Sequence, residues 1–173
     1  MFHELGETGY ARMSVDAAAR RAGVGRAAVY RRRPSKQAML TDLAGDAVRR
    51  HTPAIPGTGS LSGDIRAFLD VNVAQARYPQ VSPIVLDMLA ETARNPELAT
   101  ALRDAAAPPR RALADAVLQR AIDRGELAGD IDHEPGIGLM ISPLLFRLLI
   151  TGDSVTDDYL TRLTGMITGG LRA

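Results

Sequence analysis

The sequence has no cysteine and no tryptophan, and only four tyrosines and three phenylalanines among its 173 residues. Without cysteine the chain has no disulfides, thiol nucleophiles or zinc–thiolate sites. None of the three histidines has a second metal ligand or a nucleophile at motif spacing, and no Ser-His-Asp or phosphate-loop signature is present. The sequence therefore predicts a protein that is not an enzyme and that uses no metal and no cofactor.

Long apolar runs are also scarce. The strongest, residues 137–150, is 14 residues long and contains Pro143 and Arg147. A helix needs about 20 apolar residues to cross a bilayer, so this run predicts a buried helix. The first ten residues carry two glutamates and no apolar segment typical of a secretory signal. We therefore expect a soluble, cytoplasmic protein that makes no membrane contact.

Charge is unevenly distributed along the chain. The formal net charge is +1, but residues 1–52 carry ten Lys/Arg against five Asp/Glu, whereas residues 53–173 carry eleven against fifteen. Apolar residues make up 46% of the composition, which is enough for a packed core. This uneven charge predicts that the basic first segment, and not the acidic remainder, binds nucleic acid.

Helical periodicity dominates the chain, and no segment shows the alternation of a strand. The stretch 51–63, HTPAIPGTGSLSG, is the one convincing linker, and it separates a head (residues 1–52) from a body (residues 61–173). The pair Pro108-Pro109 is expected to break the pattern. We expect an all-α protein with helices over residues 1–7, 14–22, 26–32, 35–50, 64–78, 79–94, 96–107, 110–124, 134–151 and 156–171.

The stretch 14–36, SVDAAARRAGVGRAAVYRRRPSK, has the outline of a helix-turn-helix. Ser14 is a good N-cap, Gly23 follows the first helix as a left-handed C′ residue, and Pro34 stops the second. Residues 20–36 contain six arginines and one lysine and no acidic residue. That many uncompensated charges favour an anionic partner over a solvated basic surface.

The stretch GETGYARMSVDAAARRAGVGRAAVYRRRPSKQAML resembles the DNA-binding domain of the TetR family of bacterial transcriptional regulators. The resemblance lies in Gly9-Tyr10, Ser14-Val15, the turn 22–24, and the run Val29-Tyr30-Arg31 followed by residues 34–36. The family usually has a longer first helix than this chain. The resemblance implies a three-helix DNA-binding head, a helical ligand-binding and dimerisation body, and operator DNA as partner.

Roles in the head follow from helix-turn-helix docking, in which the second helix of the motif enters the major groove with its N-terminal residues at the base edges. Arg26 is then the best candidate for reading a guanine. Ser14 and Lys36 lie at helix N-termini, where phosphates are favoured. Arg33 stands where the family usually has an apolar or aromatic core residue, and it either extends over the core toward DNA or loosens the head. The predicted DNA-binding residues are Ser14, Arg26, Ala27, Ala28, Tyr30, Arg31, Arg32 and Lys36.

The body is predicted to pair with a second copy through its last two helices. A helix that is apolar all round must be covered on every side, and one chain of this length has few elements left to cover it. The segment SPLLFRLLITG also resembles the penultimate helix of many family members, whereas a core helix in a monomer is the alternative. The predicted interface is Leu145, Leu148, Leu149, Tyr159, Leu163, Met166 and Ile167.

A ligand pocket in the body is implied by the resemblance and weakly supported by the residues. Asn72 lies on the apolar stripe of its helix and needs a partner, either a ligand or a local hydrogen bond in the core. The two methionines in the set are common gap-fillers in cores. The candidate pocket is Phe68, Asn72, Gln75, Met88, Met140 and Leu144.

Together these observations predict a DNA-binding transcriptional regulator, a repressor released from its operator by a small hydrophobic effector. A helical small-molecule-binding protein with weakened or lost DNA binding is the main alternative. An all-helical enzyme is disfavoured because no catalytic constellation appears.

Overall fold

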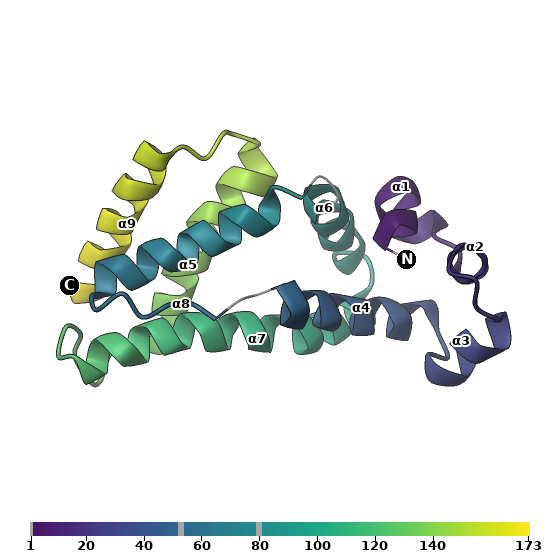
Figure 1. Cartoon of the computed structure of the whole chain (residues 1–173), viewed down its shortest axis with the longest axis horizontal. Coiled ribbons are helices and arrows are strands. Elements are labelled where there is room, and N and C mark those ends of the chain that lie inside the picture. The colour runs from purple at the N-terminus through teal and green to yellow at the C-terminus, as the bar shows by residue number, and fades with distance from the viewer. Residues whose placement is uncertain (1, 52–53, 79–80) are drawn as a thin grey trace. The chain divides into compact units, whose positions relative to one another are not determined.

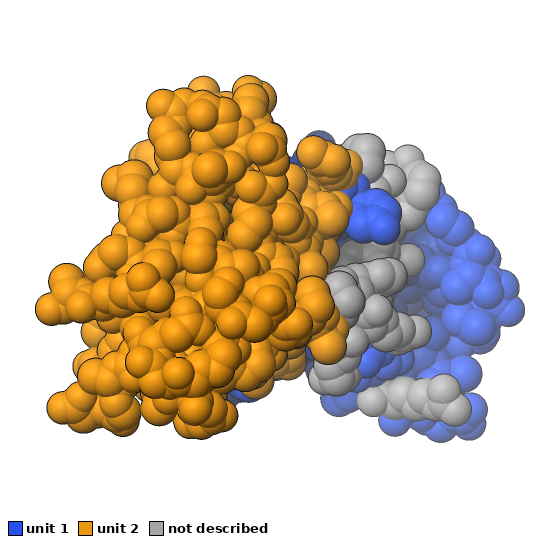
Figure 2. Space-filling view, turned by 60° about the vertical axis from the view of Figure 1, so that its left-hand side comes forward, with its two compact units in different colours: residues 1–51, 78–108 blue, residues 52–77, 109–173 orange. Residues whose placement is uncertain are grey.

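The computed structural model describes residues 2–51, 54–78 and 81–173; within these ranges the side chains of 2–4, 7, 32, 43, 47–51, 81, 106 and 110 are not described. The described residues form helices and connecting loops without a strand. Two compact units result, Met1–His51 with Tyr78–Pro108 (unit 1) and Thr52–Arg77 with Pro109–Ala173 (unit 2), coloured separately in Figure 2. The expected all-α class is confirmed.

Unit 1 contains α1 (Phe2–Arg12), α2 (Val15–Arg21), α3 (Arg26–Arg32), α4 (Lys36–His51), α6 (Val81–Thr92) and the first part of α7 (Pro96–Asp123). Helix α1 packs beside α6, as Figure 1 shows. One core cluster of this unit joins α1, α4, α6 and α7, which lie far apart in sequence: Leu5, Tyr10, Met13, Leu40 and Leu98 are buried in it, and Ile84, Met88 and Leu102 pack against them.

The first helix is longer than expected. It continues past residue 7 to Arg12, but Gly9 interrupts it with φ +70° and ψ 166°. Such a conformation is accessible almost only to glycine. The sequence-based boundary was therefore wrong, because the residues after the glycine resume helical geometry.

The prediction that Pro108-Pro109 ends a helix was also wrong. Helix α7 runs without interruption from Pro96 to Asp123. A proline inside a helix removes one backbone donor and costs about 3 kcal/mol. The two halves of the helix are buried in different cores, with Leu98 in unit 1 and Val117 and Leu118 in unit 2. The two compact units nevertheless divide at this proline pair.

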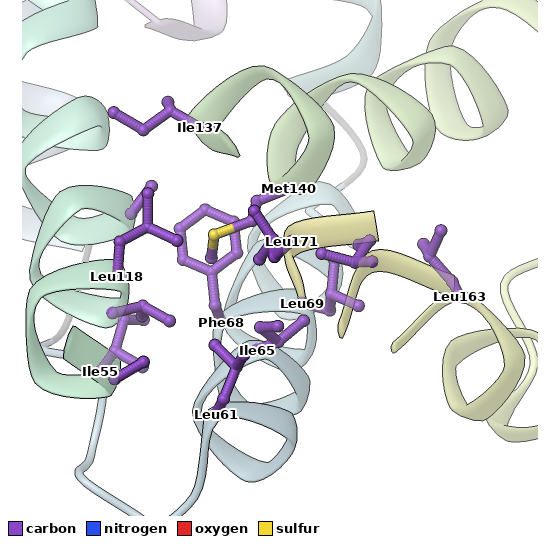
Figure 3. Packing of buried hydrophobic residues seen from close by; sticks show 14 of the residues in the cluster. Ile55, Leu61, Ile65, Phe68, Leu69, Leu118, Ile137, Met140, Leu163 and Leu171 are labelled. Carbon is purple, nitrogen blue, oxygen red and sulfur yellow. The ribbon is translucent and has the colours of Figure 1, made fainter. Parts of the chain in front are cut away.

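Unit 2 contains α5 (Leu61–Ala76), the second part of α7, α8 (His133–Leu145), the π-helix η1 (Phe146–Thr151) and α9 (Asp157–Arg172). Helix α5 packs against α9 and α8. Figure 3 shows side chains from α5, α7, α8 and α9 converging in one core, with Phe68 and Met140 near its centre. Helix α5 starts three residues earlier than expected, because Ser60 caps it by accepting a hydrogen bond from the Gly63 N–H (3.1 Å).

The penultimate helix was predicted as one α-helix and is instead two segments. Beyond Leu145 the chain winds as a π-helix and stops at Gly152, whose φ is +67°. The combined run His133–Thr151 has 19 residues with a mean hydropathy of 1.3, so by length and composition alone it could cross a membrane. Core helices of soluble proteins pass the same test, but only 22% of the window tested is buried and η1 buries no residue, so the predicted buried helix was wrong for this part of the run.

The compact units group the chain differently from the predicted head and body. Helix α6 and the first part of α7 join unit 1, although they lie in the predicted body. The predicted division at the linker, with domains over 1–52 and 61–173, stays a prediction.

Candidate DNA-binding surface

Helices α2 and α3 and the turn between them form the predicted helix-turn-helix. The Ser14 hydroxyl accepts a hydrogen bond from the Ala17 N–H (3.3 Å), and α2 buries Val15, Ala18 and Ala19. Gly23 has φ +67°, and backbone hydrogen bonds return from the turn to the last residues of α2. The polar cap, the small apolar face and the left-handed glycine thus place α3 as the sequence predicted.

Helix α3 presents an exposed, basic surface. It runs from Arg26 to Arg32 as predicted. Arg26, Ala27, Ala28 and Arg31 are exposed, and Tyr30 is half-buried. The side chain of Arg32 lies outside the described part of the structure. The structure therefore gathers four of the predicted DNA-binding residues on one accessible helix surface.

Arg26 does not extend freely from this surface. Its Nε lies 3.0 Å from Oδ1 of Asp16 in α2, and its guanidinium carbon lies 5.4 Å from the ring centroid of Tyr30. Its side chain is still 69% exposed. Sequence reasoning recognised Asp16 only as a first-turn residue of α2 and missed its pairing with Arg26.

Lys36 lies at the start of α4 and bonds within unit 1. Its Nζ donates a hydrogen bond to the carbonyl of Ala11 (3.1 Å) and lies 4.4 Å from the ring centroid of Tyr10. Burial lowers the pKa of Lys36, against the opposing charges of Glu91 and Asp87, which raise it. An ammonium has three donors, so two remain for a phosphate.

Arg33, which lacked a firm sequence explanation, forms a contact with α4. Its Nε donates to Oδ2 of Asp42 at 2.7 Å. The residue has extended backbone geometry (φ −142°, ψ 95°) and ends α3. A hollow of about 370 Å³ beside it is lined by Val24, Ala28, Val29, Arg31 and Arg33.

A second unpredicted contact joins α1 to α6. The Asp87 carboxylate accepts a hydrogen bond from the Tyr10 N–H (2.6 Å), directly after the left-handed Gly9. Burial, with the nearby charge of Glu91, raises the pKa of the Tyr10 phenol. Asp87 lies 77 residues from Tyr10, so nothing near Tyr10 in the sequence predicts this contact. The Gly9-Tyr10 pair does mark the break in α1.

The candidate pocket residues fall into both units. Phe68, Met140 and Leu144 are buried in the core of unit 2, and Met88 packs against the core of unit 1. The Asn72 amide donates to the carbonyl of Phe68 (2.8 Å), which is the local hydrogen bond that the sequence left open. Gln75 is half-buried in the same helix.

The predicted interface residues divide into buried and exposed groups. Leu163 and Ile167 are buried in the core of their own unit, whereas Leu148, Leu149 and Tyr159 are half-buried. Leu145 and Met166 are exposed, the latter to 75%. Two further exposed apolar residues of η1, Phe146 (59%) and Ile150 (62%), were not singled out by sequence reasoning.

Comparisons with known proteins cover both parts of the chain. A family profile described as "Bacterial regulatory proteins, tetR family" matches residues 2–43, and one described as "Tetracyclin repressor-like, C-terminal domain" matches residues 55–167. The HTH-type transcriptional regulator YdeS of Bacillus subtilis (strain 168) is 31% identical over 167 residues, which are 96% of this chain and 83% of YdeS.

Two further similarities agree with these matches. The "DNA-binding transcriptional repressor TetR" of Mycobacteroides abscessus (strain ATCC 19977) is 28% identical over 157 residues, 90% of this chain and 80% of that protein. The crystal structure of the TetR family transcription regulator SCO0332 superposes with a TM-score of 0.78 at 28% identity, covering 98% of this chain and 92% of that one.

Proposed function

The chain belongs to the TetR family of helix-turn-helix transcriptional regulators, and on that premise we propose that it is a repressor released from its operator by a small-molecule effector. The observation that carries the proposal is the exposed basic surface of α3, held by α2 and a left-handed turn. Repression is supported by the name of the Mycobacteroides abscessus relative. Proteins of this family are generally not enzymes.

In the proposed complex α3 lies in the major groove. Arg26 reads a guanine through its free guanidinium nitrogens, and Ala27 and Ala28 allow close approach to the bases. Tyr30, Arg31, Arg32, Ser14 and Lys36 contact phosphates or flanking bases. Electrostatic attraction to phosphates is largely independent of sequence, so these contacts supply affinity and Arg26 supplies discrimination.

The active form is proposed to be a homodimer joined by α8, η1 and α9. Five large apolar side chains on these segments are exposed within the described chain: Leu139, Leu145, Phe146, Ile150 and Met166. Exposed apolar side chains gathered on neighbouring segments of the chain favour a protein–protein interface there. A two-fold dimer places two α3 helices on half-sites one helical turn or more apart, roughly 34–36 Å or a multiple of it.

The proposed effector is a small hydrophobic molecule bound in the body, for which Phe68, Asn72, Gln75, Met140 and Leu144 are the candidate contacts in unit 2. The core around them is built almost wholly from apolar side chains. Binding of the effector and binding of the operator are then linked by one coupling free energy. DNA weakens effector binding by the same factor as the effector weakens DNA binding. We infer a cytoplasmic location, which is typical of soluble family members.

Footprinting on the region upstream of its own gene tests the proposal most directly. Purified protein at low salt is expected to protect one or two segments with dyad symmetry. Arg31→Ala, which removes an exposed cation from α3, should weaken protection, whereas Arg77→Ala, at the exposed end of α5, should leave it unchanged. Absence of binding to any duplex at low salt, with retained binding of an apolar ligand, would favour the small-molecule-binding alternative.

A further inference from the structure

The inference concerns the pair Asp16–Arg26 and rests on the proposed DNA-binding function. Residues 20–36 contain no acidic side chain, so Arg26 finds its counter-charge in the preceding helix of the motif. The two atoms Arg26 Nε and Asp16 Oδ1 are 3.0 Å apart. Both residues belong to unit 1, and both helices belong to the helix-turn-helix.

The Asp16 carboxylate depends on this contact. Its side chain is 32% exposed, but Oδ1 itself is buried and has no hydrogen-bond partner among the described residues. A buried carboxylate oxygen without a hydrogen bond is costly, and an adjacent guanidinium reduces that cost. The contact therefore favours one position of the Arg26 side chain over the many that a long exposed side chain otherwise samples.

The contact uses the inner nitrogen of the guanidinium. Asp16 approaches Nε, and the ring of Tyr30, one helical turn later in α3, lies 5.4 Å from the guanidinium carbon. Within the described residues, neither Nη group of Arg26 donates a hydrogen bond, and the side chain is 69% exposed. Two parallel Nη donors, or one with Nε, are what bidentate recognition of guanine O6 and N7 requires.

We propose that Asp16 is a specificity-determining residue that positions Arg26 for base readout, although Asp16 itself need not touch DNA. An arginine whose side chain is already positioned by Asp16 loses less conformational entropy when it binds DNA. The resulting gain in affinity applies only where that position meets a guanine. The negative charge of Asp16 opposes phosphates everywhere along the duplex. Asp16 thus lowers the affinity for DNA of any sequence and improves discrimination at the base pair that Arg26 reads.

The test measures binding of the full-length protein to a selected operator duplex and to its single-base-pair variants. Arg26→Ala should reduce discrimination at one base pair by about five- to hundredfold. Asp16→Ala should reduce discrimination at that same base pair, leave it unchanged elsewhere, and preserve or increase affinity for random-sequence duplex. The double variant Asp16→Ala/Arg26→Ala should discriminate no worse than Arg26→Ala alone, because the two residues act as one unit.

Two further variants separate positioning from folding. Asp42→Ala removes the acidic partner of a different arginine of unit 1, Arg33. It should not change discrimination at the base pair that Arg26 reads. Asp16→Asn preserves side-chain size, so it should discriminate at that base pair less well than the native protein while keeping its melting temperature within a few degrees. If Asp16→Ala fails to fold, Asp16→Asn carries the test.

The possible results are distinguishable. Equal loss of discrimination at many base pairs, or additive losses in the double variant, would overturn the positioning role while leaving the repressor proposal intact. An Arg26→Ala protein that keeps full discrimination would do the same. A native protein that binds no duplex at low salt would overturn both.

Discussion

The backbone N–H of Tyr10 donates to the carboxylate of Asp87 at 2.6 Å, so a side chain of α6 completes the bend in α1. The bend exposes a backbone donor that no residue of α1 satisfies, and Asp87 is the acceptor. The Lys36 ammonium lies on the ring of the same tyrosine. Helices α1, α4 and α6 are therefore joined at Tyr10 by polar contacts as well as by the apolar core of unit 1.

Asp87→Ala is expected to destabilise unit 1 by about 1–3 kcal/mol, because a partly buried backbone donor loses a charged acceptor. Hydrogen exchange should show the amide of Tyr10 losing protection, and urea titration should show the lower stability. The exposed Asp104→Ala is the matched control and should stay within about 0.5 kcal/mol of the native protein. Unchanged protection of the Tyr10 amide in Asp87→Ala would contradict the assignment.

Gly9→Ala should destabilise the same region by about 1–3 kcal/mol. The residue has φ +70°, and an added Cβ would lie 3.1 Å from Oδ1 of Asp87. Gly165→Ala in α9 is the control, and its effect on stability should have the opposite sign, because nothing lies within 4 Å of the added Cβ. Alanine there should stabilise by about 0.5–1 kcal/mol. Thermal unfolding followed by circular dichroism measures both.

Acid should weaken unit 2 through Asp64, which is fully buried. Burial alone would raise the pKa of Asp64, but hydrogen bonds from Thr58 and Arg120, with the charge of Arg120, lower it below its ordinary value. A lowered pKa in the folded state means that the stabilisation is complete above the unfolded pKa, about 4, and is lost as pH falls through the lower folded pKa.

Asp64→Asn should therefore lower stability at pH 7 by about 2–3 kcal/mol and flatten its decline below pH about 4. The magnitude is moderated because Arg120 and Arg124, the two arginines that contact Asp64, are partly exposed. Urea midpoints from pH 2.5 to 7 make the measurement, with the exposed Asp130→Asn as control. An Asp64→Asn protein that keeps the native pH profile would show that another carboxylate governs acid unfolding.

Lys36→Ala should weaken binding to all duplexes alike and reduce the slope of log affinity against log salt by about 0.9 for the lost phosphate contact. The reason is that only one donor of its ammonium has a described hydrogen-bond acceptor, Ala11. Fluorescence anisotropy across a salt series gives the slope, and Arg77→Ala, at the exposed end of α5, is the control. A native slope in Lys36→Ala would restrict this lysine to its contacts with Tyr10 and Ala11.

Met166→Asp should convert the proposed dimer into monomers, because a carboxylate would be buried without a partner in an apolar interface. Sedimentation velocity at micromolar concentration measures the change. Ala128→Asp adds the same charge to an exposed loop of unit 2 and should leave the dimer intact. A Met166→Asp protein that still sediments as a dimer would place the interface elsewhere.

The sequence by itself determined the helix-turn-helix. Its signals are local: the Ser14 cap, the left-handed Gly23 and the stop at Pro34 act within a few residues of the helices that they bound. The bounds of α3 therefore agree with the prediction to the residue. The all-α class likewise followed from periodicity, which each helix carries in its own residues.

Only the tertiary structure decided the features that depend on distant partners. Helix α7 continues through Pro108-Pro109, and its two halves bury residues in different cores, which no local window of sequence contains. The acceptor for Tyr10 lies 77 residues away, and the acidic partner of Arg26 lies in another helix. Local signals defined the bounds of α3 but not those of α7, and they did not decide which polar side chains meet, because those contacts depend on free energies summed over the folded chain.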